Sequence, residues 1–465
     1  MDKTKHNNNC RKHIQTTLWE NSSESKDNIG GHSCVKIHPK QKAKHELIEM
    51  ILDRNNLNAA FKKVKENKGS PGIDGITTEE LSEHLRKNKE EILGKIRARK
   101  YKPTPVKRVQ IPKPNGKVRN LGIPITTDRV IQQAILQVLS PIYEKQFSDN
   151  SFGFRPGRGC HDALKRVMEY AKEGYLWVVD LDLEKFFDTV NQSKLIQILS
   201  KTIEDGDVIS LIHKFLKAGI MDNGVKIASV RGVPQGGPLS PLLANIILNE
   251  ADQELDKWGY KFVRYADDLL IFAKNRKAAE RYYRRVKKLL ETNLKLKVNE
   301  EKSEIRKLID TKYLGYGFQV KDKIELTVHP ESSLKFKAKL KEITGRSNGM
   351  SHSFRRTKLN QLIRGWIQYF KLANVGYLLI DLDKWLRRRI RACAWKAWKL
   401  PKTKFKYLKA LGINACKAWQ WSYTRVGVWK VAGSPIMQMS LTNKTLESRG
   451  YLSMANYYDK VHVKL

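Results

Sequence analysis

The stretch Phe262-Val-Arg-Tyr-Ala-Asp-Asp-Leu-Leu-Ile-Phe272 decides the fold of this chain. Apolar, β-branched and aromatic residues flank Asp267 and Asp268, which predicts two buried strands with the two acids at the tip of the hairpin between them. Because neighbouring carboxylates repel each other and resist burial, a positive charge is expected between them. Mg²⁺, a hard cation that prefers oxygen ligands, fits that place. Taken alone, the Asp-Asp pair is better explained as an ordinary acidic turn.

A second apolar run upstream carries acids of its own. Residues 176–183 read as a buried strand that contains Asp180 and Asp182, and residues two apart share one face of a strand. If this strand lies beside the hairpin, three or four carboxylates meet at one end of a sheet and can hold two Mg²⁺ about 3.5–4 Å apart, as in enzymes of phosphoryl transfer. Two unrelated acidic turns are the alternative, because chain order alone does not bring the segments together.

The charge of the chain indicates a polyanionic partner. Its 465 residues include 88 Lys and Arg against 48 Asp and Glu, a formal net charge of +40, which favours nucleic acid through phosphate neutralisation and counterion release. We expect no membrane association, since there is no apolar run of about 18 residues and the polar N-terminus does not resemble a signal peptide. The five cysteines are far apart, as in a reducing compartment. These features predict a cytoplasmic protein associated with nucleic acid.

Two segments offer groups that suit a nucleotide. Strands are expected over 106–111 and 118–123, joined by a turn at Lys113-Pro-Asn-Gly-Lys117, and this hairpin presents Lys113 and Arg119 to a phosphate. Lysines that keep an exposed edge hairpin soluble would look the same. Further along, Gln235 lies in a Pro/Gly-rich turn before a helix that starts at Ser240. A fixed amide beside acidic strands suits contact with a base or a sugar.

The last third of the chain is strongly basic and helical. Residues 331–465 hold 28 Lys and Arg against 6 Asp and Glu, and apolar residues recur at helical spacing over 359–370 and 382–400. The face opposite the second apolar stripe carries four arginines within 387–391, which predicts a surface for the backbone of structured RNA. The tentative RNA contacts are Arg387, Arg388 and Arg391. An ordinary solvated helix is the alternative.

The order of motifs resembles the group II intron-encoded reverse transcriptases, also called maturases. YADD alone is weakly specific, but the ordered set, which extends the likeness over roughly residues 45–465, is highly specific. The matching blocks are GSPGIDG (69–75), the hairpin ending in RNLGIP (119–124), SFGFRPGRG (151–159), VVDLDLEKFFD (178–188), PQGGPLSP (234–241), YADD (265–268), NEEKS (299–303) and YLGYGF (313–318).

The resemblance implies an α+β fold of the right-hand polymerase type. Fingers and palm with an antiparallel sheet are expected over 43–325, a helical thumb or maturase X domain over 326–400, and a small basic DNA-binding domain over 401–465. Residues 1–42 are expected to form a disordered basic arm. The paired cysteines and histidines of an HNH-type endonuclease are not found after Asn414, as in the compact bacterial class without that domain.

The resemblance also implies the roles of single residues. In the family, the first metal-binding aspartate stands five residues before an aromatic steric gate, which matches Asp182 and Phe187; a bulky ring there favours deoxynucleotides. The implied catalytic residues are Asp182, Asp267 and Asp268, which with Leu183 are also the implied ligands of two Mg²⁺ ions. The implied nucleotide contacts are Lys113, Arg119, Phe187, Gln235 and Lys302, and the implied primer grip is Leu314 and Gly315.

The implied function is that of an RNA-directed DNA polymerase encoded by a group II intron. Such a protein binds its intron RNA, promotes splicing, and carries out target-primed reverse transcription in retrohoming, with an RNA template, a DNA primer, target DNA and deoxynucleoside triphosphates as partners. A domesticated reverse transcriptase, of the retron, diversity-generating or defence-linked kind, is one alternative, against which the long basic thumb argues. A splicing-only maturase is another, against which the intact acids argue.

Overall fold

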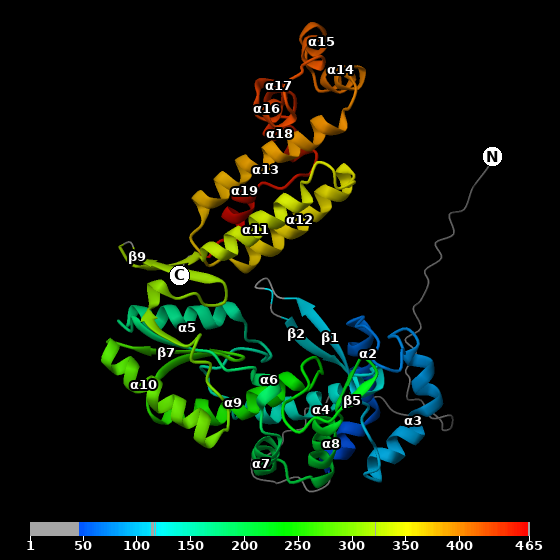
Figure 1. Ribbon diagram of the computed structural model, residues 1–465, viewed down its shortest axis with the longest axis vertical. Coiled ribbons are helices and arrows are strands. Elements are labelled where there is room, and N and C mark those ends of the chain that lie inside the picture. The colour runs from blue at the N-terminus through cyan, green and yellow to red at the C-terminus, as the bar shows by residue number, and fades with distance from the viewer. Residues whose placement is uncertain (1–45, 113–115, 117, 321, 464–465) are drawn as a thin grey trace, which may run out of the picture. The chain divides into compact units, whose positions relative to one another are not determined.

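The computed structural model describes residues 46–112, 116, 118–320 and 322–463 (Figure 1). The basic arm predicted for residues 1–42 and the predicted phosphate contact Lys113 lie outside these residues. The described chain divides into two compact units. The first comprises the residues up to 159, 179–271 and 277–304, and the second comprises 160–178, 272–276 and 305–465.

The core of the first unit is built around α4 (Thr126–Glu144), in which Val130, Ala134 and Leu139 recur at helical spacing and are buried. Helices α1, α2, α3 and α9 all pack against α4. The other helices assigned to this part of the chain are α1 (Glu46–Leu52), α2 (Arg54–Glu66), α3 (Leu81–Arg97), α6 (Phe186–Thr189), α7 (Gln192–Thr202), α8 (Gly206–Lys217), α9 (Ser240–Lys257) and α10 (Arg276–Lys288), and the last is followed by a π-helical turn over Leu289–Asn293.

The expected hairpin over 106–123 is confirmed. Strands β1 (Val106–Pro112) and β2 (Val118–Ile123) pair antiparallel, with Lys107 opposite Ile123. They belong to a four-stranded sheet of order β2-β1-β4-β5, in which β4 (Ile220–Asp222) runs parallel to β1 and antiparallel to β5 (Val225–Ile227).

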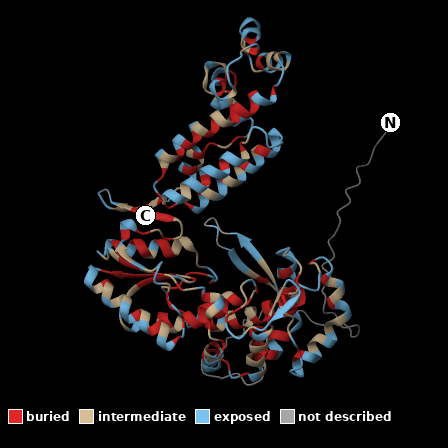
Figure 2. Cartoon of the chain, viewed as in Figure 1, coloured by how far each residue is buried: buried red, intermediate tan, exposed pale blue. Residues whose placement is uncertain are grey.

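A second four-stranded sheet carries the acidic segments. Its order is β6-β7-β3-β8, and its strands are β6 (Lys261–Tyr265), β7 (Asp268–Ala273), β3 (Trp177–Leu181) and β8 (Glu304–Lys307). Strand β7, which begins at the second acid of the hairpin, is therefore hydrogen-bonded to β3, which leads to Asp182. Figure 2 shows the red of buried residues along β6, β7 and β3, as expected for runs of Val, Leu, Ile and Phe.

The second unit is mainly helical, as the stripes of its sequence predict. Helices α11 (Pro330–Ile343), α12 (His352–Tyr369) and α13 (Gly376–Ala397) pack together, and the ring of Trp366 stacks on Phe336 at 4.3 Å in their core. Helix α19 (Met454–Val461) packs against α12 and α13 (Figure 1). The remaining elements are α5 (Cys160–Lys172), β9 (Tyr316–Val320), β10 (Ile324–Val328), α14 (Pro401–Ala410), α15 (Ala415–Ser422), α16 (Val428–Gly433), α17 (Pro435–Ser440) and α18 (Asn443–Ser448).

No helix among the described residues is both long enough and apolar enough to cross a lipid bilayer.

Candidate active site

The pairing of β3 with β7 brings the predicted acids into one electrostatic neighbourhood. The pKa of Asp268 is raised to about 6, first because the surrounding protein partly desolvates its carboxyl group, although the residue keeps contact with water, and then because Asp267, Asp180 and Asp182 are negatively charged nearby. The ammonium group of Lys302 acts in the opposite direction on the same pKa. The structure thus brings together the acids of both segments. This excludes the alternative of two unrelated acidic turns.

The segment Asn299–Ser303 holds Asp182 from both its backbone and its side chain. The Asp182 Oδ2 accepts hydrogen bonds from Lys302 Nζ at 2.9 Å and from Asn299 Nδ2 at 3.0 Å. The backbone N–H of Asn299 donates to the carbonyl oxygen of Asp182 at 2.9 Å, and that of Asp182 donates to Ser303 Oγ at 3.1 Å. Lys302 was predicted at this site, whereas Asn299 and Ser303 were missed, although they belong to the same motif.

The predicted metal ligands are of the types that Mg²⁺ prefers, but their side chains are not arranged around an ion. In the described part of the chain, no three His, Cys, Asp or Glu side chains are placed to hold a metal together. The physical reason is that Asp182 is turned toward the cationic Lys302, which partly neutralises the acids. Leu183, the implied main-chain ligand, is buried and forms a β-bridge with Val298. Carboxylate and carbonyl oxygens are the ligands that Mg²⁺ prefers, so the residue types fit this ion.

A buried ion pair holds the turn that carries Asp267. Ala266 has a left-handed φ of +58°, which is unfavourable for a residue with a Cβ. Its carbonyl oxygen accepts a hydrogen bond from Arg264 Nη1 at 2.9 Å, and the same nitrogen donates to Asn245 Oδ1 at 2.9 Å. Arg264 Nε also bonds both carboxylate oxygens of Asp252, at 2.8 and 3.0 Å. Arg264 and Asp252 are 2% and 0% exposed, so this network is part of the core.

A glycine of the SFGFRPGRG motif lies directly beneath the same turn. A Cβ built on Gly153 would lie 2.3 Å from the backbone nitrogen of Ala266, so the two backbones touch where no side chain fits. The Gly153 carbonyl accepts a hydrogen bond from Asn245 Nδ2 at 2.8 Å, and Phe152 N–H donates to the carbonyl of Arg264 at 2.9 Å. Gly153 therefore has a structural role in this motif, because it lets the two backbones pack together.

Arg264, Asp252 and Asn245 were missed because a charged or amide residue inside a strand or helix is usually exposed. The available signal was that Arg264 interrupts the apolar run before YADD, in a strand that has no polar alternation. Burial raises the pKa of Asp252 above its usual range, and the Arg264 guanidinium opposes that effect.

Three of the five predicted nucleotide contacts, Arg119, Phe187 and Gln235, lie on three neighbouring stretches of the first unit. Phe187 is on α6, and its carbonyl oxygen accepts a hydrogen bond from Val233 N–H at 2.7 Å. With its amide oriented to satisfy its neighbours, Gln235 accepts from Arg119 Nη2 and donates to the carbonyl of Asn120, both at 3.1 Å. The Gln235 turn therefore joins β2 directly, and the structure brings Arg119 and Gln235 together.

The predicted primer-grip residues belong to the second unit. Leu314 and Gly315 form a turn before β9 with φ of +49° and +79°, where glycine is favoured at the second position. The Leu314 carbonyl accepts a hydrogen bond from the hydroxyl of Tyr369 at 2.9 Å, and the Gly315 carbonyl accepts one from Ser332 Oγ at 2.9 Å. Side chains of α11 and α12 thus fix this turn.

The exposed arginine face predicted for α13 is wrong for two of its three residues. Arg387 and Arg391 are 7% and 8% exposed. Arg387 pairs with Glu447 at 2.7 Å, and Arg391 donates to the carbonyl of Leu441 at 2.8 Å. Arg388 is half-buried and lies over the ring of Trp429 at 4.2 Å. These residues are covered by the short helices that follow α13, which the periodicity of α13 alone does not reveal.

Two family models match the chain. Residues 111–318 match the model of the reverse transcriptase (RNA-dependent DNA polymerase), and residues 333–412 match the group II intron, maturase-specific domain. The first range holds the acids and all five predicted nucleotide contacts, and the second holds most of α11 and the helices α12 to α14.

Several curated proteins are similar in sequence. Protein YkfC of Escherichia coli is 34% identical over 56% of this chain and 78% of its own length. The group II intron-encoded protein LtrA of Lactococcus lactis is 39% identical over 54% of this chain but only 42% of its own length. A putative COX1/OXI3 intron 1 protein of Saccharomyces cerevisiae is 26% identical over 79% of this chain and 49% of its own length. By these matches, the chain belongs to the family of group II intron-encoded reverse transcriptases and maturases, which are RNA-directed DNA polymerases.

Proposed function

We propose that this chain synthesises DNA on an RNA template at the cluster formed by Asp182, Asp267 and Asp268, with two Mg²⁺ ions held by these carboxylates and the main chain of Leu183. The observation that supports this proposal most directly is the pairing of β7 with β3, which places the charges of Asp180, Asp182 and Asp267 close enough to raise the pKa of Asp268. A mutually repulsive cluster of this kind is costly unless a cation binds it.

The ions, when bound, supply a positive field that activates the primer 3′-hydroxyl and stabilises the leaving pyrophosphate. The residues of the chain prepare the cluster for them. Lys302 partly neutralises Asp182, and both Lys302 and Asn299 orient it through hydrogen bonds to its Oδ2. Metal binding requires this carboxylate to turn from Lys302 toward the other acids. Arg264 fixes the carbonyl of Ala266 and so the direction in which Asp267 leaves the turn.

The nucleotide lies in this proposal between β2, α6 and the Gln235 turn. Arg119 provides a guanidinium group for the triphosphate, which its hydrogen bond to Gln235 keeps in place. Lys113 would add a second cation. The Phe187 ring, on the short helix that follows Asp182, excludes a ribose 2′-hydroxyl by its bulk and so favours deoxynucleotides. Leu314 and Gly315 support the primer strand.

The second unit gives the proposed partners. Its match to the maturase-specific domain, over residues 333–412, supports binding of intron RNA and promotion of splicing. We propose in addition target-primed reverse transcription in retrohoming, with target DNA bound by the most C-terminal helices. The proposed location is the cytoplasm, in a ribonucleoprotein at the nucleoid. A splicing-only maturase is the second candidate, because that same match concerns RNA processing and not synthesis.

Replacement of Asp267 by Asn tests the proposal with little change of shape. We expect primer extension with Mg²⁺ and deoxynucleotides to fall to background, because the cluster loses a ligand charge, while binding of intron RNA is unchanged. Glu301→Gln, an exposed acid in the segment that holds Asp182, is the matched control and should leave synthesis intact. Normal synthesis by Asp267→Asn would refute the metal assignment. Splicing without synthesis in the unmodified protein would favour the second candidate.

A further inference from the structure

The helices after α13 form a small module with an apolar core of its own. Helices α14 and α15 pack on each other, and Phe405 and Trp421 turn toward their shared core. The buried residues of this core are Ala394, Trp395, Trp398, Leu408, Ala418, Val431, Met437 and Leu441. The large side chains on the outer faces of α14 and α15 are not part of this core. They can therefore contact a binding partner.

Two aromatic rings stand on the outer side of α15. Trp419 and Tyr423 are four residues apart, each is 59% exposed, and their ring centroids are 5.2 Å apart. A pair of rings at helical spacing that does not serve the core leaves apolar surface in contact with water, which is typical of a binding surface. Trp421, between them in sequence, packs against the core, so the outward direction of its two neighbours follows from the helical period.

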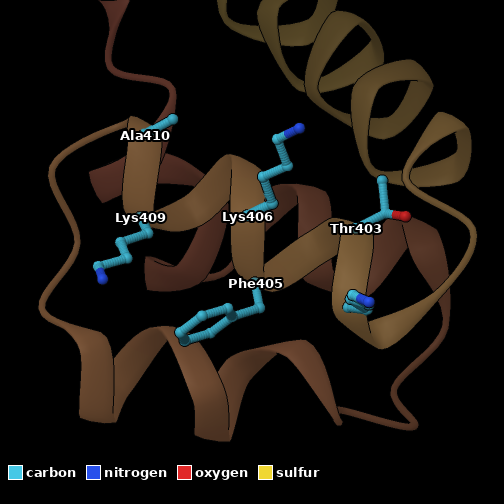
Figure 3. A pocket seen from close by; sticks show the side chains of 6 residues that line it. Thr403, Phe405, Lys406, Lys409 and Ala410 are labelled. Atoms are coloured by element: carbon cyan, nitrogen blue, oxygen red, sulfur yellow. The ribbon is translucent and has the colours of Figure 1, made fainter.

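The neighbouring helix α14 presents cations. Lys402, Lys406 and Lys409 are exposed, and together with Phe405 they line an open hollow on this module (Figure 3). In Figure 3 the Lys406 and Lys409 chains extend from the helix, whereas the Phe405 ring turns toward a neighbouring one. Residues 384–446 contain 15 Lys and Arg and no Asp or Glu. The first acid after this stretch, Glu447 of α18, pairs with Arg387 and not with these three lysines.

We propose that the outer surface of α14 and α15 binds an unpaired nucleic-acid strand, with bases stacked on Trp419 and Tyr423 and phosphates neutralised by Lys402, Lys406 and Lys409. Stacking needs the flat faces of bases, which are hidden inside a duplex, so rings and lysines together favour a single strand. This inference deepens the proposed function and rests on it, because it states that the C-terminal helices hold the target DNA as a single strand.

The test measures binding of labelled oligonucleotides to the full chain carrying Asp267→Asn, which prevents synthesis. An unstructured DNA strand, the matching RNA strand and their duplexes are titrated over a range of salt. Trp419→Ala and Tyr423→Ala should each weaken single-strand binding roughly 5- to 100-fold, with duplex binding and the salt dependence unchanged. Lys406→Gln with Lys409→Gln should instead reduce the slope of log affinity against log salt by about 1.4.

Matched variants separate stacking from a general loss of structure. Trp419→Phe should retain most of the affinity, and Tyr377→Ala, which removes a ring that is 87% exposed on α13, should change nothing. Equal losses for single strands and duplexes, or no loss, would overturn the proposal. Vesicles of phosphatidylserine and phosphatidylcholine are titrated in parallel. If the Trp419 and Tyr423 variants lose binding to the vesicles alone, the proposal is also overturned. Failure here while Asp267→Asn still abolishes synthesis would leave the polymerase assignment standing.

Discussion

The acidic centre of the first unit and the basic helices at the end of the second both concentrate charge of one sign, but they treat it differently. At the acidic centre, partial burial of the Asp268 carboxyl group and then the nearby charges of Asp267, Asp180 and Asp182 raise its pKa to about 6. In the C-terminal helices, Arg387 and Arg391 turn inward to carboxylate and carbonyl groups, and the lysines of α14 are spread along a surface. Like charges lie close together where a metal ion is expected to bind. They are spread over a surface where the expected ligand is a nucleic-acid strand.

The largest effect is expected from breaking the support of the acidic centre. Arg264→Met leaves Asp252 buried without its cation, which should lower the free energy of unfolding by roughly 3–5 kcal/mol and abolish synthesis. Urea denaturation and primer extension measure the two effects.

The double variant Arg264→Met with Asp252→Leu separates stability from positioning. It should recover much of the stability, because no unpaired charge remains, but synthesis should stay low, because the Ala266 carbonyl still lacks its donor. Full synthesis by the double variant would show that the ion pair serves stability alone.

A buried acid outside both regions shows what burial does where the one like charge, that of Asp74, is the smallest cause of the pKa shift. Tyr101 Oη and Thr104 N–H donate hydrogen bonds to Asp128, and burial is the largest cause that raises its pKa to about 6. The folded chain therefore binds this proton more tightly than the unfolded chain. Stability from Asp128 should fall as pH rises from about 4 to about 6 and be constant above, by up to about 3 kcal/mol.

Urea denaturation at several pH values checks this slope. Asp128→Asn should remove it, and added salt should leave it nearly unchanged in the parent protein, because burial and not a neighbouring charge is the main cause. An unchanged slope in Asp128→Asn would assign the effect to another group.

Arg387→Met tests whether the inward arginines of the basic region serve structure. Loss of the ion pair with Glu447 and of the hydrogen bond to the Asn443 carbonyl should lower the unfolding free energy by roughly 1.5–3 kcal/mol. Affinity for intron RNA should not change, whereas Lys406→Gln should weaken nucleic-acid binding without loss of stability. A folded Arg387→Met protein that binds RNA poorly would restore the prediction made from the sequence.

The smallest effect is expected at the acidic centre's neighbour Phe187. Phe187→Ala should reduce the preference for deoxynucleotides over ribonucleotides by roughly tenfold or more, because the space for a 2′-hydroxyl opens. The ratio of kcat/KM values for the two nucleotide types measures it, and Phe187→Tyr is the control that keeps the bulk. Unchanged discrimination in Phe187→Ala would exclude the gate.

The acidic centre was predictable from the sequence because its strands are apolar runs interrupted by acids. The order of the motifs resembles that of a known family, which implies that the two acidic segments share one site. The β1–β2 hairpin and the helices α11 to α13 were predictable for similar reasons of turn chemistry and period. The direction of the Asp182 side chain toward Lys302 was not, since a rotamer depends on neighbours 120 residues away. The burial of Arg387 was not predictable either. Helices as short as α16 to α18 have too few turns for their apolar residues to indicate which helix they pack against.

The contact of Gly153 with Ala266 has a practical consequence for genetics. Any residue other than glycine at position 153 would push against the main chain that carries Asp267, so a single methyl group there should silence DNA synthesis without removing any charge from the protein. Gly153→Ala would thus provide an allele in which DNA synthesis and RNA processing can be measured separately, with every acidic residue still present.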